Sequence, residues 1–301
     1  MLLQPLRVVA AVVALLAACA AALAGDPAVS ERRDLAYLPG TPAARLDVYR
    51  PAGATGPLPA VIWVHGGAFV TGSKEEVAPY LKRIAAAGYA VVGLDYTLAP
   101  AARYPRPVEE VNAALGFLSA NAADLGIDGD RLFIAGDSAG AQVAGQVANL
   151  VADPAYAKAM GIVPALDRTA LRGVILFCGI LDPETSRTDG PFGDFMKAIS
   201  TAYFGTPDLL AYPRLREFSV VRNVSAGLPP LFISVGNADP LAPHSERMAE
   251  VAAALGVSVT TVFFAADAKP ALEHEYQFDL STHPARIAFA RMIAFLAKNA
   301  R

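Results

Sequence analysis

Short runs of apolar residues, many of them β-branched, alternate along the chain with longer amphipathic segments. The short runs are apolar at almost every position, which is typical of strands that are covered on both faces of a sheet. Seven such runs predict strands: Leu46–Tyr49, Val61–His65, Ala90–Leu94, Leu132–Ala135, Val174–Phe177, Leu231–Val235 and Val257–Phe264. This alternation predicts an α/β fold with a doubly wound, mostly parallel sheet and helices on both faces.

The amphipathic segments carry helix start and stop signals. Ser73-Lys74-Glu75-Glu76 has the spacing of a capping box, and Gly88 is a typical stop after the helix that would follow. Further helices are expected from Pro107 to about Asn121, from Ala139 to about Leu150, from about Ser245 to Leu255 and from Pro284 onward. In such a doubly wound sheet, ligands bind at the carboxyl ends of the strands.

The stretch from Leu181 to about Ala226 interrupts the alternation, because it mixes aromatic residues with several prolines and glycines. Two interpretations remain open. The stretch could be a lid or pocket wall over a site, or its aromatic side chains could simply attach a helical insertion to the domain. The first interpretation makes several aromatic side chains candidates for substrate binding. They are Phe69, which lies in a glycine-rich loop upstream, and Phe192, Phe195, Tyr203 and Phe204 of the stretch itself.

The first two dozen residues have the pattern of an export signal. Arg7 precedes the apolar run Val8–Ala18, and Ala22-Leu23-Ala24 forms a small-x-small cleavage site. Removal of residues 1–24 would leave one α/β domain over residues 25–301. Alternatively, residues 16–19 resemble a bacterial lipobox, so that residues 1–18 would be removed and Cys19 lipidated, which would attach the protein to a membrane. Both interpretations predict export, to the periplasm or beyond.

Composition limits the remaining possibilities. The chain has 301 residues, of which 54% are hydrophobic and 18% charged, and this suits one large domain with a buried sheet. A net charge of -3 and the absence of any Lys/Arg run give no electrostatic reason to expect a nucleic acid partner. Of two cysteines, Cys19 lies in the signal region, so the mature domain would have no internal disulfide, and Cys178 is expected to be a buried apolar residue.

The strongest chemical signal is Gly136-Asp137-Ser138-Ala139-Gly140, a G-x-S-x-G motif. It follows the predicted strand at 132–135 and opens the predicted helix that begins at Ala139. A nucleophilic serine requires this strand–turn–helix context, because the sharp turn exposes its hydroxyl and the glycines allow close backbone approach. The motif therefore predicts Ser138 as a catalytic nucleophile.

A glycine loop, residues 65–69 with the sequence His-Gly-Gly-Ala-Phe, follows the predicted strand at 61–65. Its backbone amides would lie at the carboxyl edge of the sheet, near the expected position of Ser138. We expect the amides of Gly66, Gly67 and Ala139 to form an oxyanion hole. His65 is expected to brace the loop by hydrogen bonding rather than to act as a base.

A serine nucleophile needs a base and an acid that orients the base. Asp239 follows the strand predicted at 231–235, and His274 follows the strand predicted at 257–264, so both would lie at the carboxyl edge. We expect Asp239 and His274 to complete a triad with Ser138. The rival acids are Asp182 and Asp267, and the other histidines are His65, His244 and His283.

These motifs, namely residues 65–69, 136–140, Asn237-Ala238-Asp239-Pro240-Leu241 and His274, resemble a known group of α/β-hydrolases. The group comprises relatives of hormone-sensitive lipase and the bacterial feruloyl esterase-like carboxylesterases. The resemblance covers nearly the whole mature chain, including residues 95–100 and the stretch from Tyr104-Pro105 to Glu110. It implies attack of Ser138 on an ester carbonyl, with no metal and no cofactor.

The sequence also departs from the family pattern. Thr97 stands where the family usually has arginine, and Ala101-Ala102 stand where Glu-His commonly follows the proline. The mature chain has roughly twenty residues before the first predicted strand, which is little for the two-helix cap typical of hormone-sensitive-lipase relatives and favours the shorter, feruloyl esterase-like branch. In that branch the insertion at about 181–226 would contribute more to substrate selection.

The expected function is hydrolysis of small or short-acyl carboxylic esters by an acyl-enzyme mechanism, with a small-molecule ester as partner. Two alternatives remain open. The same triad could serve an amidase, formamidase or peptidase, because the fold supports many acyl transfers. The protein could instead be a non-catalytic binding protein with the hydrolase fold. No pattern in the sequence predicts an oligomeric state.

Overall fold

A computed structural model describes residues 28–186 and 189–301, so the predicted export signal and Cys19 lie outside the described residues. The strands are β1 (Val29–Ala36), β2 (Arg45–Pro51), β3 (Leu58–Val64), β4 (Ala90–Leu94), β5 (Ile127–Asp137), β6 (Leu171–Phe177), β7 (Leu231–Ser234) and β8 (Val259–Val262). The α-helices are α2 (Lys74–Ala86), α3 (Arg106–Ala120), α4 (Ala122–Leu125), α5 (Ser138–Ala152), α6 (Pro154–Met160), α7 (Gly190–Phe204), α8 (Leu215–Phe218), α9 (Ala242–Ala254) and α10 (His283–Asn299).

The strands form one eight-stranded sheet in the order β1-β2-β4-β3-β5-β6-β7-β8. The pairs β1–β2 and β2–β4 are antiparallel, and the remaining pairs are parallel. This confirms the predicted doubly wound, mostly parallel sheet. Strand β1 was not predicted, because its sequence VSERRDLA is largely charged and its side chains are mostly exposed at the edge of the sheet.

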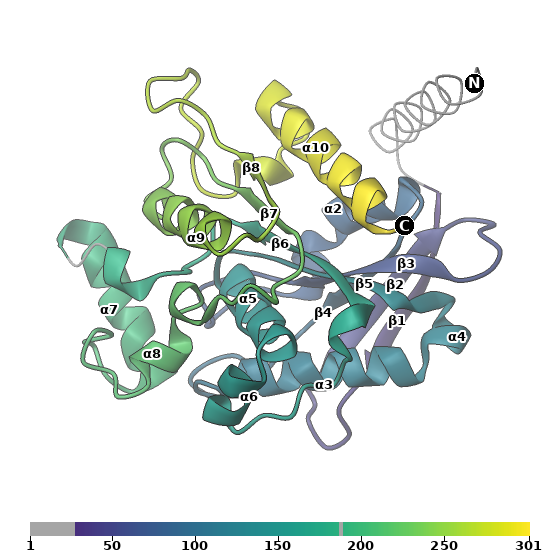
Figure 1. The fold of residues 1–301 in the computed structure, drawn as a ribbon, viewed down its shortest axis with the longest axis horizontal. Helices are drawn as coiled ribbons and strands as arrows, with labels where there is room; N and C mark the ends of the chain where they lie inside the picture. Colours follow the sequence, from purple (N-terminus) through teal and green to yellow (C-terminus); the bar gives the residue numbers. More distant parts are fainter. Residues whose placement is uncertain (1–27, 187–188) are drawn as a thin grey trace.

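Helices cover both faces of the sheet (Figure 1). On one face, α2 and α10 pack on the sheet through a cluster that includes Trp63, Leu81 and Phe289. On the other face, α3, α5 and α9 pack through a larger cluster that includes Ile62, Val111 and Val147. The parallel strands are therefore shielded from solvent on both sides, which accounts for their continuous apolar sequences.

Helix α2 begins where the sequence predicted, but its N-terminus is stabilised differently. Ser73 occupies the N-cap position with an extended backbone, yet its side chain makes no capping hydrogen bond. Instead, the amide of Lys74 donates to the carboxylate of Asp95 at 2.7 Å. The cap of this helix is thus supplied from the loop after β4, a contact between distant parts of the chain that a local sequence pattern does not contain.

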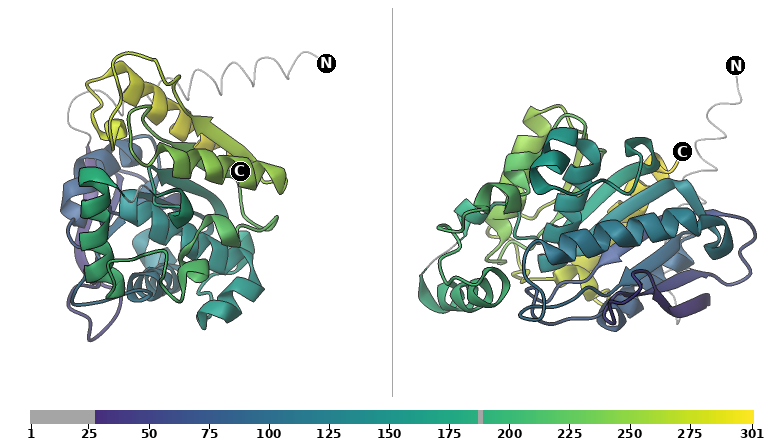
Figure 2. Two further views of the ribbon diagram at one scale, coloured as in Figure 1. Left: turned by 90° about the vertical axis from the view of Figure 1, so that its left-hand side faces the viewer. Right: turned by 90° about the horizontal axis from the view of Figure 1, so that it is seen from below.

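The predicted insertion contains α7 and α8, which lie at the end of the molecule opposite α4 (Figure 2). It is attached to the domain by aromatic packing. Tyr203 near the end of α7 is fully buried and stacks on Phe69, with ring centroids 4.1 Å apart. Within the ranges that the structure describes, none of the helices is both long and apolar enough to cross a membrane.

Candidate active site

Ser138 stands at the junction of β5 and α5, where the backbone turns sharply. Its φ angle is 51°, a left-handed conformation that is strained for a residue with a side chain. The turn brings α5 against the backbone of β3, so a Cβ atom on Gly140 would overlap the carbonyl oxygens of Val64 and His65. Glycine is therefore required at this position, and the local geometry is that of a nucleophile elbow.

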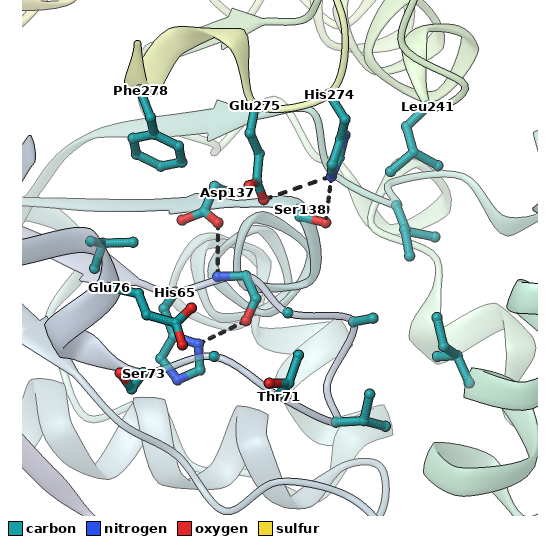
Figure 3. Close-up of a pocket in the computed structure, with 18 of the residues that line it drawn as sticks. His65, Thr71, Ser73, Glu76, Asp137, Ser138, Leu241, His274, Glu275 and Phe278 are labelled. Carbon is teal, nitrogen blue, oxygen red and sulfur yellow. Dashed lines mark hydrogen bonds and ion pairs between the residues drawn. The ribbon is translucent and has the colours of Figure 1, made fainter. Parts of the chain in front are cut away.

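The structure brings Ser138, His274 and Asp239 together, and Figure 3 shows Ser138 beside His274. The Oγ atom of Ser138 lies 3.0 Å from Nε2 of His274, and Nδ1 of His274 lies 2.8 Å from Oδ2 of Asp239. The other carboxylate oxygen of Asp239 accepts a hydrogen bond of 2.8 Å from the amide of Leu241. The carboxylate is thus fixed at both oxygens, and the chain of contacts has the geometry of a serine–histidine–acid triad.

The surroundings of His274 favour its protonated form. Burial acts to lower the pKa of the imidazole, but the hydrogen bond and the charge of Asp239 raise it, as do the charges of Glu275 and Asp137. The net effect is a pKa above the usual 6.5. Such a histidine can take a proton from the serine and hold it while the reaction proceeds.

The rival residues have other partners. The backbone amide of Asp182 donates to Nδ1 of His244 at 3.2 Å, and the carboxylate of Asp182 accepts from the amide of Glu184 at 3.3 Å. Burial lowers the pKa of His244 to about 4, so its ring is neutral. Asp239, and neither Asp182 nor Asp267, is the aspartate that contacts His274.

His65 braces the glycine loop, as the sequence analysis expected. Its Nδ1 lies 2.7 Å from the carbonyl oxygen of Gly66, and its ring stacks on Tyr96 with centroids 4.5 Å apart. Burial lowers the pKa of His65 to about 4. The neutral ring therefore donates from Nδ1 to the carbonyl and fixes the direction of the loop.

The prediction for Gly66 in the oxyanion hole is wrong, because its amide is already engaged. The Gly66 N–H donates to Oδ2 of Asp137 at 2.8 Å. In the part of the chain that is described, the amides of Gly67 and Ala68 donate to no protein acceptor, and Ala139 lies in the first turn of α5, where amides lack intrahelical partners. The amides available to an oxyanion beside Ser138 are therefore those of Gly67, Ala68 and Ala139.

A cavity of about 610 Å³ opens over Ser138. Phe192 and Phe195 of α7 line its apolar side, as predicted. The predictions for the other three aromatic residues are wrong. Phe69 and Tyr203 are buried against each other, and Phe204 packs against Tyr104, Tyr212 and Phe218, so all three belong to the core that anchors α7. The insertion thus combines both proposed roles, with a pocket wall in α7 and an aromatic anchor at its end.

Two carboxyl groups near the triad were missed by the sequence analysis. Asp137 precedes the nucleophile and Glu275 follows the histidine, and the two side chains approach each other beside Ser138 (Figure 3). Glu275 also lies near the base, with Oε1 3.7 Å from Nε2 of His274. The only available signal was their position in the sequence, next to two triad residues.

The side chains also indicate whether a metal could bind. Among the described residues, one group has metal-ligand spacing: Cys178, Asp239 and His274, whose ligand atoms lie within 4.8 Å of one another. Burial raises the pKa of the Cys178 thiol well above its usual value, and the imidazole of His274 is hydrogen-bonded to the carboxylate of Asp239. This arrangement suits a hydrogen-bonded triad better than a metal site.

The departure at Thr97 is accommodated by a local network. The Thr97 amide and hydroxyl both donate to the buried carboxylate of Glu110, at 2.6 and 2.9 Å. Arg106, one helical turn before Glu110, donates to the same carboxylate at 2.8 Å. Arg106 of α3 therefore supplies the cation that pairs with the buried carboxylate of Glu110.

Comparison with known proteins places this site among esterases. Residues 46–252 match the family model BD-FAE. The chain is 31% identical over 256 residues to "Carboxylesterase NlhH" of Mycobacterium tuberculosis, covering 83% of this chain and 77% of that protein. It is similar in structure to the thermophilic carboxylesterase EstE1 from a metagenomic library, with a TM-score of 0.75, 27% identity and coverage of 99% and 97%. Esterase B of Lactobacillus rhamnosis has the same fold, with a TM-score of 0.78, 24% identity and coverage of 97% and 96%.

Proposed function

The chain belongs to the BD-FAE family and has the α/β-hydrolase fold, and we propose that it is a carboxylesterase whose nucleophile is Ser138. One observation carries this proposal: the hydrogen-bonded line from Ser138 through His274 to Asp239, with distances of 3.0 and 2.8 Å. Ser138 and His274 line a cavity of about 610 Å³, a volume within the usual range for small-molecule sites.

In the first half of the reaction, Ser138 attacks the ester carbonyl while Nε2 of His274 takes the hydroxyl proton. Asp239 keeps the Nδ1 proton in place and stabilises the imidazolium that forms. The amides of Gly67, Ala68 and Ala139 support the negative charge that develops on the carbonyl oxygen. Each donor of this kind typically contributes about 2.7–4 kcal/mol to lowering the barrier.

The first half ends when His274 gives this proton to the leaving alcohol, which departs and leaves an acyl-enzyme. In the second half, water enters, and the same imidazole takes a proton from it as the water attacks the acyl carbon. The new carboxylic acid is released when His274 returns that proton to Ser138. Every proton is thus exchanged through one nitrogen atom, and the chemistry needs only residues of this chain.

The cavity walls support small esters with a modest apolar group as substrates. On one side, α7 and the neighbouring loops present Phe192, Phe195, Met196 and Ile199. On the opposite side, the lining is more polar and includes Glu76 and Glu275. A short acyl or alkyl group fits the apolar side, and its burial there contributes roughly 25 cal/mol per Å² of apolar surface.

The first test is hydrolysis of p-nitrophenyl esters from acetate to palmitate, with p-nitroanilides of the same acids as controls. We expect turnover that is highest for short acyl chains and that is lost in Ser138→Ala. Labelling of Ser138 by a fluorophosphonate, detected by mass spectrometry, should follow the same pattern. Turnover of anilides but not esters would favour an amidase, and no turnover with no labelling would contradict a catalytic function.

Export of the enzyme is also part of the proposal. Its support is the pattern of Arg7, the apolar run at 8–18 and the two candidate processing sites that follow it. The mass of the mature N-terminus in a bacterial host distinguishes them, because simple cleavage leaves Gly25 first and lipidation leaves a modified Cys19. A full-length, unprocessed chain in the cytoplasm would contradict export.

A further inference from the structure

Asp137 is enclosed between three segments of the active site. It lies next to the nucleophile, its Oδ1 accepts from Nε1 of Trp63 at 2.7 Å, and its Oδ2 accepts from the amide of Gly66 at 2.8 Å. Its side chain is fully buried. This carboxyl group therefore ties the glycine loop and β3 to the elbow that carries Ser138.

Glu275 approaches the same point from a further segment, the loop that carries His274. It directly follows His274, its φ angle is 60°, and its carboxyl group faces that of Asp137 beside Ser138 (Figure 3). A Cβ atom on Gly66 would overlap Oδ2 of Asp137 and lie 3.1 Å from Oε1 of Glu275. Both carboxyl groups thus meet over Gly66, between the glycine loop and the loop that carries the base.

When two carboxyl groups face each other and one of them is buried, the state in which one keeps its proton is favoured over the state with two negative charges. Burial is the main reason that Asp137 keeps its proton, and the charge of Glu275 adds to the effect, so that the pKa of Asp137 rises to about 8. Glu275 is partly exposed, with 35% of its side chain accessible, and water can solvate its charge. The proton therefore lies on Asp137, whose O–H donates to the carboxylate of Glu275.

Of the other titratable groups around the pair, Tyr96 and Cys178 are neutral, whereas His274 interacts with both carboxyl groups. Tyr96 and Cys178 lie near Asp137, and burial raises the pKa of both so far that they stay protonated. His274 lies beside Glu275 and is separated from it by 3.7 Å. No lysine or arginine lines the cavity among the residues that the structure describes. Apart from His274, whose charge depends on its own protonation, no cation among the described cavity-lining residues could replace the shared proton of the pair.

From these contacts we propose that Asp137 and Glu275 share one proton in the active enzyme and together act as positioning residues. The pair holds the glycine loop and the histidine loop against the nucleophile elbow, and it keeps one carboxylate beside His274 to stabilise the imidazolium. This inference rests on the proposed function for its catalytic consequence, but not for the proton sharing itself.

The proposal has a consequence at alkaline pH. When hydroxide removes the shared proton, two negative charges face each other in a buried position, and the exposed Glu275 is the side chain that can move away. Glu275 then no longer lies beside His274, and the glycine loop and the loop that carries His274 lose their contact. We therefore expect kcat/KM to fall as the pH rises through the ionisation of Asp137.

The proton can be followed without any activity measurement, because Trp63 is the only tryptophan in the chain and donates directly to Asp137. Ionisation of Asp137 changes the charge next to the indole and should shift its fluorescence emission. We expect one transition with a midpoint near pH 8 in the wild-type protein. In Glu275→Gln the amide can donate to an ionised Asp137, so the midpoint should fall by about one pH unit or more.

Matched variants make this titration specific. Glu76 also lines the cavity, and its carboxylate has no described partner. Glu76→Gln should therefore leave the midpoint of the fluorescence transition within about 0.3 pH units of the wild-type value. Glu275→Ala serves as a second variant if Glu275→Gln fails to fold, and it should also lower the midpoint. The absence of a transition between pH 6 and 10 in the wild type would overturn the proposal. So would a midpoint that Glu275 variants leave in place, or one that Glu76→Gln moves equally.

The catalytic part is tested by the pH profile of kcat/KM on p-nitrophenyl butyrate. The alkaline limb of the wild type should have the same midpoint as the fluorescence transition, and the two should move together in Glu275→Gln. Ester hydrolysis whose alkaline limb does not follow the fluorescence would overturn the positioning role. Absence of all ester hydrolysis beside a normal fluorescence transition would instead contradict the proposed function and leave the proton sharing in place.

Discussion

Replacing Asp239 with asparagine should leave the shape of the triad intact and remove its function. The amide of Leu241 can only donate, and it already donates to Oδ1 of Asp239 at 2.8 Å. An asparagine would therefore direct its oxygen to Leu241 and its NH₂ group toward Nδ1 of His274. A donor at that position forces Nδ1 to become the acceptor and moves the imidazole proton to Nε2. The nitrogen that should accept the proton of Ser138 would then already carry one.

The expected loss in kcat/KM for Asp239→Asn is about 10⁴-fold, the loss associated with a wrong tautomer in such triads. This corresponds to about 5.4 kcal/mol of barrier at 1.36 kcal/mol per factor of ten. Asp239 also holds the pKa of His274 above 6.5. In the wild type, activity should thus decrease as the pH falls through that raised pKa, and the residual activity of the variant should decrease only at a lower pH.

The assay is kcat/KM on p-nitrophenyl butyrate from pH 5 to 9, together with the thermal unfolding midpoint of each variant. Asp182→Asn is the matched control, because Asp182 also follows a strand but contacts no member of the triad. We expect that control to retain activity within about threefold. Retention of more than a tenth of the wild-type activity in Asp239→Asn, or an equal loss in the control, would refute the tautomer argument.

Four further predictions follow from the site and its walls. Gly66→Ala should abolish most ester hydrolysis, because its Cβ would overlap Oδ2 of Asp137, and soluble protein with wild-type kcat/KM would contradict the packing described. Tyr203→Ala should lower the free energy of unfolding by about 3 kcal/mol in urea titrations, since the ring is fully buried. Phe195 is 53% exposed, so Phe195→Ala should lower the free energy of unfolding by less than about 1 kcal/mol while it changes the preference among p-nitrophenyl esters of different acyl length. The described lining of the cavity has acidic residues and no lysine or arginine, so p-nitrophenyl hemisuccinate should react at least about tenfold less efficiently than the butyrate ester at low salt, and a preference for the anion would contradict this electrostatic argument.

The sequence predicted the parts of the molecule that local patterns encode. Parallel strands are buried on both faces, so β3 to β7 appear as apolar runs, and residues at their carboxyl ends must meet at one edge of the sheet. For this reason Ser138, Asp239 and His274 could be chosen from their positions after strands, and the structure brings them together. Strand β1 was not predicted because an exposed edge strand needs no apolar run.

The remaining features depend on contacts that no spacing rule contains. The amide of Gly66 was expected to face the substrate, but a carboxylate 71 positions away accepts it. Tyr203 was expected to line the pocket, but it stacks on Phe69 of the glycine loop and is buried in the core. Aromatic and acidic residues have several satisfactory environments, and only the three-dimensional arrangement selects one of them.

The close approach of Gly140 to the backbone of β3 also bears on how such an enzyme can diversify. The nucleophile is held in place by contact between main chains, and these atoms are the same whatever the side chains are. The apolar wall of the cavity, by contrast, consists of side chains from α7, a helix anchored at its far end. Substitutions along that wall can therefore alter which esters bind while Oγ of Ser138 stays in the same position. Natural selection can thus change the substrate range without changing the chemistry.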